Sequence, residues 1–151
     1  GIKTVFNVVG ILNSSSKMVN VARKSASLTM RPWGVYYGWD NGQGWNLKTV
    51  YVNPGKRLSL QYHHGRSEHW MLVDGDAIAT IRNPSGSEEK YPLRLGESFR
   101  VGKGTVHRLE SKRGGVIVEV ALGDFDEDDI VRIEDDHGRV PHKGKRVRKM
   151  T

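Results

Sequence analysis

The sequence predicts an all-β domain that closes into a sandwich or a barrel. From Leu47 onward, short segments rich in Val, Ile, Leu, Thr and Tyr are separated every eight to twelve residues by Gly, Pro, Asn or Asp, which is the spacing typical of all-β proteins. A chain of 151 residues is also long enough to bury a core in one domain without disulfide or metal staples. Eight strands are enough to close such a fold, and we expect them at residues 47–52, 57–63, 68–73, 77–82, 88–93, 98–101, 107–111 and 116–122.

Turn signals connect some of these segments. The pair Asp74-Gly75 lies between two apolar runs, and both central positions of a tight hairpin turn favour residues that accept a positive φ. We therefore expect a hairpin there and a second turn at residues 83–86. After Gly123, an acidic segment leaves room for one more short strand at 130–133.

The beginning of the chain has a weaker pattern. Residues 1–30 are expected to form an N-terminal extension, and residues 31–139 the folded domain. The four tryptophans are expected mainly to pack in the core or at an interface, with stacking on a bound ligand as the alternative. The aromatic segment 33–45 could instead exchange onto a partner barrel, and a homodimer is expected.

Positive charge is concentrated in the last residues. The net charge is +7, but residues 139–151 hold six Lys/Arg and no acid, which leaves 18 basic and 17 acidic side chains in residues 1–138. The basic tail, residues 140–151, is expected to be disordered and either solvated or paired with the acidic segment 124–136. Binding of nucleic acid or another polyanion by the tail is the lesser alternative.

Composition excludes several classes of protein. The chain contains no cysteine, so disulfides, thiolate zinc sites and cysteine nucleophiles are excluded. No apolar run approaches the roughly 20 residues of a membrane helix, and no signal peptide is evident. The first residue is Gly1, which leaves the natural start open. We expect a cytoplasmic protein that does not associate with membranes.

Four side chains can ligate one metal ion. Gln61 and His63 are two residues apart, so they project to the same face of a strand, while Tyr62 and His64 project to the other. Glu68 follows a short turn and is expected to fold back beside the first pair as a hairpin, and His107, at the start of a late strand, is expected opposite them. This nitrogen and oxygen set suits Zn²⁺, and also Fe²⁺, Mn²⁺, Co²⁺ or Ni²⁺. A single histidine in a strand is more often a structural residue, so the prediction depends on the spacing.

That spacing resembles the two-part motif of the cupins. The first part runs from Gly55 through Gln61, His63 and Glu68 to Gly75, and the second from Gly96 through Gly104 to His107. The resemblance implies a cupin double-stranded β-helix, which is a jelly-roll barrel, with one divalent metal ion. Gln61 stands where most cupins have histidine and Gly102 where proline is usual. Glutamine at the first ligand position is similar to the zinc-dependent phosphomannose isomerases, so zinc is the first choice of metal.

A closer resemblance is carried by longer segments. The chain is similar to the C-terminal mannose-6-phosphate isomerase domain of the type II bifunctional enzymes over residues 31–139. It departs from that family at Gly65, where a third successive histidine is usual, and at His137, where tyrosine is common. Those enzymes also carry a mannose-1-phosphate guanylyltransferase domain, which this sequence lacks, so nucleotidyl transfer is not expected of this chain alone. The segments that match are RPWGVYYGWDNGQGWNLKTVYVNPG, LSLQYHHGRSEHWMLVDGDAIATI, GTVHRLE and DDIVRIEDDHGR.

The resemblance implies interconversion of mannose 6-phosphate and fructose 6-phosphate through a cis-enediolate, in which the metal acts as a Lewis acid. A base must carry the proton, and the candidates are His64, His69, Glu110, Glu119 or a water on the metal. The substrate phosphate requires cationic donors. Arg57 is the first choice for the phosphate, followed by Arg66. The predicted catalytic residues are Arg57, His64 and His69. The full list of candidates for the phosphate is Arg57, Arg66, Lys103 and Arg108.

The sequence is also compatible with other functions. The main alternative is a non-catalytic cupin that binds metal or sugar and acts with a separate guanylyltransferase, which the missing domain and Gly65 both favour. A third possibility is an iron-dependent oxygenase, against which Gln61 in place of histidine argues. The fourth is polyanion binding by the basic tail.

Overall fold

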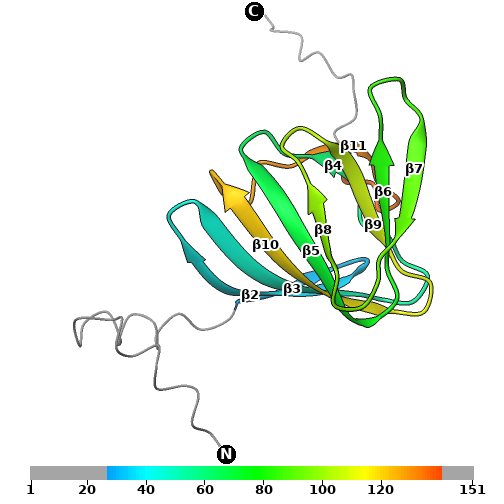
Figure 1. Ribbon diagram of the computed structural model, residues 1–151, viewed down its shortest axis with the longest axis horizontal. Coiled ribbons are helices and arrows are strands. Elements are labelled where there is room, and N and C mark those ends of the chain that lie inside the picture. The colour runs from blue at the N-terminus through cyan, green and yellow to red at the C-terminus, as the bar shows by residue number, and fades with distance from the viewer. Residues whose placement is uncertain (1–26, 141–151) are drawn as a thin grey trace, which may run out of the picture.

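Two antiparallel β-sheets face each other in the computed structural model, which describes residues 27–140 (Figure 1). The described residues contain strands and no helix, and so no helix among them is long and apolar enough to cross a membrane. The strands are β1 Ser27–Arg31, β2 Gly34–Gly42, β3 Trp45–Val52, β4 Leu60–Tyr62, β5 Arg66–Gly75, β6 Ile78–Arg82, β7 Glu88–Pro92, β8 Ser98–Val101, β9 Val106–Glu110, β10 Gly115–Gly123 and β11 Val131–Glu134.

The order of the strands is that of a jelly roll. The first sheet runs β1-β2-β3-β10-β5-β8, and the second runs β11-β4-β9-β6-β7. Chain segments that follow each other therefore often lie in opposite sheets, as β4 and β5 do. The predicted all-β jelly roll is confirmed, and each of the eight expected strands overlaps an observed one. The short strand expected at 130–133 is β11.

Two strands at the start of the described chain were not predicted. β1 and β2 pair with each other, and β2 pairs with β3. The aromatic segment 33–45 therefore lies in the chain's own sheet, and Trp33 is buried in the core. Glycines interrupt this segment and weaken its strand pattern. Residues 27–30 of the expected N-terminal extension belong to the sheet, whereas its residues 1–26 and the tail residues 141–151 lie outside the described part of the chain.

The hairpin predicted at Asp74-Gly75 is wrong. β5 pairs with β8 and β10, whereas β6 pairs with β7 and β9, so this turn carries the chain from one sheet to the other. Only Gly75 has a positive φ, of 73°. Directly after this turn, the Asp76 carboxylate accepts hydrogen bonds from the backbone N–H groups of Lys112 at 3.0 Å and Arg113 at 2.8 Å, which tie it to the loop between β9 and β10. The turn expected at 83–86 does join a hairpin, that of β6 and β7.

The interior of the barrel changes from apolar to polar along its length. Val50, Leu72, Leu109 and Ile117 are buried in the apolar part, where each fully buried side chain of this size contributes roughly 1.5–3 kcal/mol. Trp70 stacks on Phe99 with ring centroids 6.2 Å apart. Beyond Trp70, the buried side chains are histidine, glutamate and arginine. This polar part of the interior is where the candidate site lies.

Candidate metal centre

Three strands bring the predicted metal ligands together, though not in the expected arrangement. Gln61 of β4 pairs directly with His107 of β9, so these two side chains share a face of the second sheet. His63 follows the end of β4, and Glu68 projects from β5 in the facing sheet. Glu68, and not His107, therefore projects from the opposite sheet, because the chain passes from the second sheet to the first after β4 and does not fold back as a hairpin.

The cluster of His63, Glu68 and His107 is compact and buried. The Nε2 atom of His63 lies 3.0 Å from Glu68 Oε1, and the Nε2 atom of His107 lies 3.6 Å from Glu68 Oε2. The three residues are 2%, 3% and 2% exposed, and one ligand atom from each lies within 4.8 Å of the others. Atoms bound at about 2.0–2.2 Å to one ion are roughly 3–4 Å apart, so a small contraction would let this cluster hold a metal ion.

Hydrogen bonds to the backbone orient both imidazole rings. The Nδ1 atom of His63 lies 2.6 Å from the carbonyl oxygen of Asp129, and that of His107 lies 2.8 Å from the carbonyl oxygen of Thr105. A carbonyl only accepts, so each Nδ1 carries a proton and each Nε2 faces the cluster. There a neutral ring offers its lone pair to a metal ion, whereas a protonated ring donates to Glu68. His107 Nε2 is buried with no hydrogen-bond partner among the described residues. These features fit a divalent cation.

Gln61 lies at the rim of the cluster. Its Nε2 atom is 3.5 Å from His63 Nε2, and its Oε1 atom accepts a hydrogen bond of 2.6 Å from Ser59. A half-turn of the amide would direct Oε1 toward the cluster and let Nε2 donate to the Ser59 hydroxyl. Gln61 can therefore serve as the fourth ligand without movement of the backbone.

The protonation states of the cluster suit a metal. Burial alone would raise the pKa of Glu68, but the hydrogen bond from His63 and the charges of His107 and Arg66 hold it well below its ordinary value. Arg66 donates from Nε to Glu68 Oε1 at 3.1 Å. Burial lowers the pKa of His107. At neutral pH Glu68 is therefore a carboxylate and His107 a neutral imidazole, as metal ligation requires.

Glu119 of β10 is a second inward carboxyl group. It pairs across the first sheet with Lys48 of β3 and Trp70 of β5, which are both buried in the interior. Burial and the nearby charge of Glu68 raise the pKa of Glu119 to about 7, although Lys48 acts in the opposite direction. Glu119 is not one of the candidate metal ligands, so it adds a titratable group beside the cluster.

The three predicted catalytic residues do not enter the interior. Arg57 is exposed and pairs with Asp136, with Arg57 Nε 2.6 Å from Asp136 Oδ2. His64 is exposed and its ring packs edge-on against Tyr62 at 5.1 Å. His69 alternates with Glu68 and Trp70 along β5, so it faces the other side of the sheet. These positions argue against a catalytic role for each.

The predicted phosphate-binding residues have other partners. Arg66 is buried under Phe125, at 4.9 Å from the ring centroid, and donates to the Asp126 carbonyl at 2.8 Å. Arg108 is buried and donates to the Glu134 carbonyl at 3.3 Å. Lys103 is exposed in the turn before β9. Only Arg66 lies beside the cluster, where it holds Glu68.

A cavity of about 330 Å³ opens beside Gln61. Its volume is at the lower end of the range for small-molecule sites. Three arginines that the sequence reasoning did not select line it. All three lie in segments that resemble the isomerase domain, but only strand pairing shows that they meet. The lining residues are Thr29, Arg31, Trp33, Tyr36, Leu58, Ser59, Gln61, Glu127, Asp128, Ile130, Arg132 and Arg139.

The segment between β10 and β11 holds the chain around Gly65 in place. The Asp129 carboxylate accepts hydrogen bonds from the backbone N–H groups of His64 at 3.0 Å and Gly65 at 2.8 Å. The carbonyl of Gly65 accepts one from Asp124 at 3.1 Å. A Cβ atom at Gly65 would lie 2.7 Å from the Asp124 carbonyl oxygen. Gly65 is therefore required by close backbone contact.

Restoring the histidine that is usual at this position is expected to destabilise the protein. Gly65→His should lower the free energy of unfolding by about 1–3 kcal/mol, because backbone atoms must move to admit the side chain. Thermal or urea unfolding measures this. Gly102→Ala is the control, since its Cβ would meet only the Thr105 hydroxyl, at 3.3 Å. Unfolding of Gly65→His at or above the wild-type midpoint would contradict this account.

Comparison with known proteins identifies relatives of the chain. The family model described as mannose-6-phosphate isomerase C-terminal matches residues 19–135. The xanthan biosynthesis protein XanB of Xanthomonas campestris is 43% identical over 112 residues, which cover 72% of this chain and 23% of that protein. The mannose-1-phosphate guanylyltransferase ManC of Salmonella typhimurium is 41% identical over 114 residues, which cover 73% and 22%. The chain thus spans about a quarter of the length of these relatives.

Solved structures share the fold at low sequence identity. The capsular polysaccharide assembling protein CapF of Staphylococcus aureus matches with a TM-score of 0.65 and 16% identity, over 74% of this chain and 35% of that one. Oxalate decarboxylase of Bacillus subtilis, an enzyme with Mn(II) centres, matches with a TM-score of 0.62 and 16% identity, over 72% and 30%. These similarities confirm the cupin fold of the described residues.

Proposed function

The chain belongs to the family of the mannose-6-phosphate isomerase C-terminal domain, and from this premise we propose that it is a metal-dependent isomerase that interconverts mannose 6-phosphate and fructose 6-phosphate. The observation that carries the proposal is the buried cluster of His63, Glu68 and His107, with Gln61 at its rim and a cavity of about 330 Å³ beside it. We propose zinc as the ion, because its ligands are two imidazoles, a carboxylate and an amide oxygen.

The residues around the cluster have different roles in the proposed reaction. A divalent ion held there would supply Lewis-acid stabilisation to charge that develops on the two adjacent sugar oxygens. Arg66 holds Glu68 as a carboxylate through its 3.1 Å hydrogen bond. Trp70 lies under the cluster, with its ring centroid 5.5 Å from that of His107, and excludes water from that side.

Glu119 is the group that we propose moves the proton between C1 and C2. Glu68 is committed to the cluster, and His64 and His69 face away from the interior. Glu110, the other carboxylate considered, is bound to Lys90 at 2.8 Å and alternates with the inward Leu109. Glu119 is therefore the remaining inward carboxyl group that is not a candidate metal ligand. A general base operates best when its pKa is near the working pH.

The proposal is tested by a coupled isomerase assay with mannose 6-phosphate. Protein treated with a chelator is expected to be inactive, and one equivalent of Zn²⁺, Co²⁺ or Mn²⁺ is expected to restore turnover. Elemental analysis of the protein as purified identifies the bound ion. Turnover that persists in protein shown to be free of metal would contradict the mechanism.

A non-catalytic cupin that acts with a guanylyltransferase is the second candidate. It is favoured by one observation, that a relative named as a guanylyltransferase is about four times the length of the matched region. The two functions separate in the same assay. A chain that binds one metal ion tightly but shows no turnover with any of the three ions would support the second candidate.

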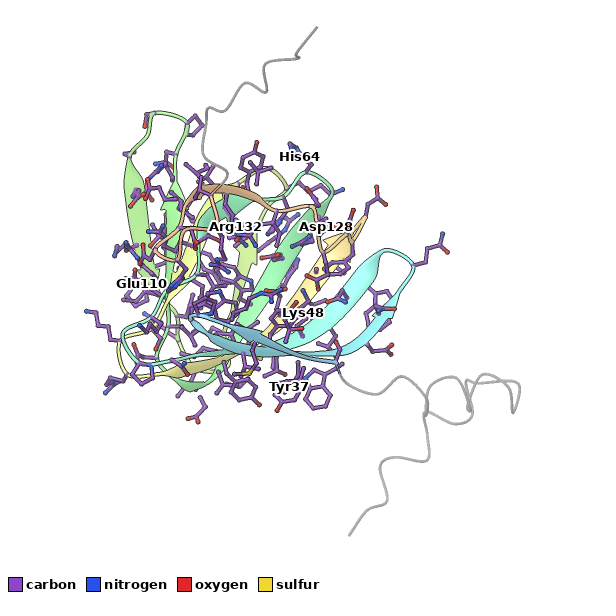
Figure 2. All side chains as sticks on the ribbon, turned by 180° about the vertical axis from the view of Figure 1, so that it is seen from behind. Tyr37, Lys48, His64, Glu110, Asp128 and Arg132 are labelled. Atoms are coloured by element: carbon purple, nitrogen blue, oxygen red, sulfur yellow. The ribbon has the colours of Figure 1, made fainter. Side chains whose placement is uncertain are left out.

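We also propose that the chain forms a homodimer through the outer face of the first sheet. Trp39, Tyr51 and Met71 on that face are 46%, 36% and 39% exposed, and Figure 2 shows Tyr37 projecting from it, away from Lys48. Soluble monomers rarely expose apolar patches of this kind.

Light scattering after size exclusion tests the homodimer. It should give twice the chain mass for the wild type, and Met71→Lys should reduce the measured mass to that of the monomer. A monomeric wild-type chain would contradict this proposal.

A further inference from the structure

Three arginines from distant parts of the sequence converge on the cavity beside Gln61. Arg31 comes from β1 in the first sheet, Arg132 from β11 in the second, and Arg139 from the segment that follows. Figure 2 shows Asp128 and then Arg132 along the segment that follows β10 and includes β11. This segment thus forms one wall of the cavity.

Strand pairing places Arg132 on the same face as the candidate ligands. Arg132 pairs with Gln61 across β11 and β4, and Gln61 pairs with His107 across β4 and β9. Side chains of directly paired residues lie on the same face, with Cβ atoms about 4.5–5.5 Å apart. Arg132, Gln61 and His107 therefore form a row across the inner wall, and the cavity extends from Gln61 toward the arginines.

The guanidinium of Arg132 is short of partners. Its Nε atom is buried and has no hydrogen-bond partner among the described residues. Burial lowers the pKa of Arg132, and the charges of Arg139 and Arg31 act in the same direction, with Asp135 opposing them. Like charges brought together in a partly buried place are costly unless an anion joins them.

The other two arginines are held in place but keep free donors. Arg139 donates from Nε to Asp135 Oδ2 at 3.0 Å, and the Asp135 side chain is fully buried. Arg31 donates to the Met30 carbonyl at 3.1 Å, and its guanidinium carbon lies 5.5 Å from the centre of the Tyr36 ring. A guanidinium has five N–H donors, so both retain donors for a further acceptor.

Two carboxylates also line the cavity, and they limit where an anion can bind. Glu127 is neutralised by Lys48, with the Lys48 Nζ atom 2.7 Å from Glu127 Oε1. Asp128 is exposed on the segment before β11. Carboxylates repel an anion and accept hydrogen bonds from hydroxyl groups. The anion therefore belongs with the arginines, and the carboxylates suit a polyhydroxylated part of the same ligand.

We propose that Arg31, Arg132 and Arg139 form a phosphate subsite, which holds the terminal phosphate of a phosphorylated sugar whose other end reaches Gln61. Arginine pairs bind phosphate oxygens through parallel charge-assisted hydrogen bonds. The identification of the ligand as a sugar phosphate rests on the proposed isomerase function, whereas the anion site rests on the arginines alone. The subsite replaces Arg57, Lys103 and Arg108 as the phosphate-binding group.

The subsite is tested by titrating inorganic phosphate into the full chain by calorimetry, with and without metal. The chelator-treated protein is expected to bind phosphate, and Arg132→Gln to weaken that binding roughly 10- to 100-fold, as for loss of charge-assisted hydrogen bonds. Arg94→Gln is the matched control, because the Arg94 side chain is 82% exposed and Arg94 is not among the residues that line the cavity. It should bind phosphate like the wild type.

Several outcomes would overturn the subsite. Equal phosphate affinity in Arg132→Gln and the wild type would do so, as would binding seen only with metal present and insensitive to the substitution. If Arg132→Gln fails to fold, as circular dichroism would show, Arg31→Gln on the exposed β1 strand serves instead, with the same expectation.

Turnover separates this proposal from the isomerase proposal. In an active chain, Arg132→Gln should raise the KM for mannose 6-phosphate by a similar 10- to 100-fold, with a smaller effect on kcat. An unchanged KM would overturn the subsite while leaving the isomerase intact. An inactive chain whose phosphate affinity still falls in Arg132→Gln would refute the isomerase and retain the anion site.

Discussion

Replacing His63 by alanine is expected to abolish both stoichiometric metal binding and isomerase turnover. His63 supplies one of the two imidazole lone pairs of the cluster, and its loss also removes the hydrogen bond that lowers the pKa of the buried Glu68. Loss of an outer-shell partner alone costs roughly 10- to 100-fold in metal affinity or activity. Loss of a ligand should therefore reduce metal affinity by at least about 100-fold. Elemental analysis and the coupled assay measure the two effects.

His64→Ala is the matched control for this experiment. The neighbouring histidine is exposed, and its ring contacts Tyr62, not the cluster. It should retain metal and activity. If His63→Ala still bound one equivalent of zinc with wild-type affinity, the cluster would not be the metal centre. If it lost the metal but kept turnover, the metal-dependent mechanism would be refuted.

The second large effect is expected from Glu119→Gln. Removal of a positioned base typically costs about 10²–10⁴-fold in rate, so kcat should fall by that factor. Metal content and KM should change little, because the amide keeps the size of the side chain and Glu119 occupies no ligand position. Steady-state kinetics on metal-loaded protein separate kcat from KM.

Glu110→Gln provides the comparison for Glu119. Both are half-buried strand glutamates, but Glu110 pairs with Lys90. Its substitution should leave kcat near the wild-type value. A kcat reduced less than about tenfold in Glu119→Gln, with metal retained, would exclude Glu119 as the base, because general-base catalysis contributes more than this.

The sequence predicted the parts of the fold that depend on local pattern. Strands from Leu47 onward alternate or carry β-branched residues, and turn residues bound them, so their positions are visible without a structure. β2 was missed because glycines at positions 34, 38 and 42 interrupt its aromatic residues. The candidate ligands were predicted because a motif fixes their spacing. The sheet from which each ligand projects was not predicted, because it depends on where the chain passes from one sheet to the other.

The predicted catalytic residues Arg57, His64 and His69 lie away from the cluster for a different reason. Alternation along β5 already placed His69 opposite to Glu68, and the same rule placed His64 opposite to His63. The residue type suggests a base or a phosphate ligand at these positions, whereas strand alternation directs the side chains away from the cluster. Arg132 was missed because its nearness to Gln61 comes from pairing between strands about 70 residues apart, and the Arg57–Asp136 contact spans 79 residues. Pairing at such separations has no signal in one sequence.

The role of the Asp129 carbonyl has a consequence for the order in which the protein is made. A nascent chain that has emerged only as far as Gly123 contains every candidate ligand and ten of the eleven described strands. It still lacks the carbonyl that orients the His63 ring and the arginine beside Gln61. Since synthesis runs from the N-terminus, the hydrogen bond that orients the His63 ring can form only after residue 129 has left the ribosome. The candidate ligands are thus made before the backbone group that orients one of them.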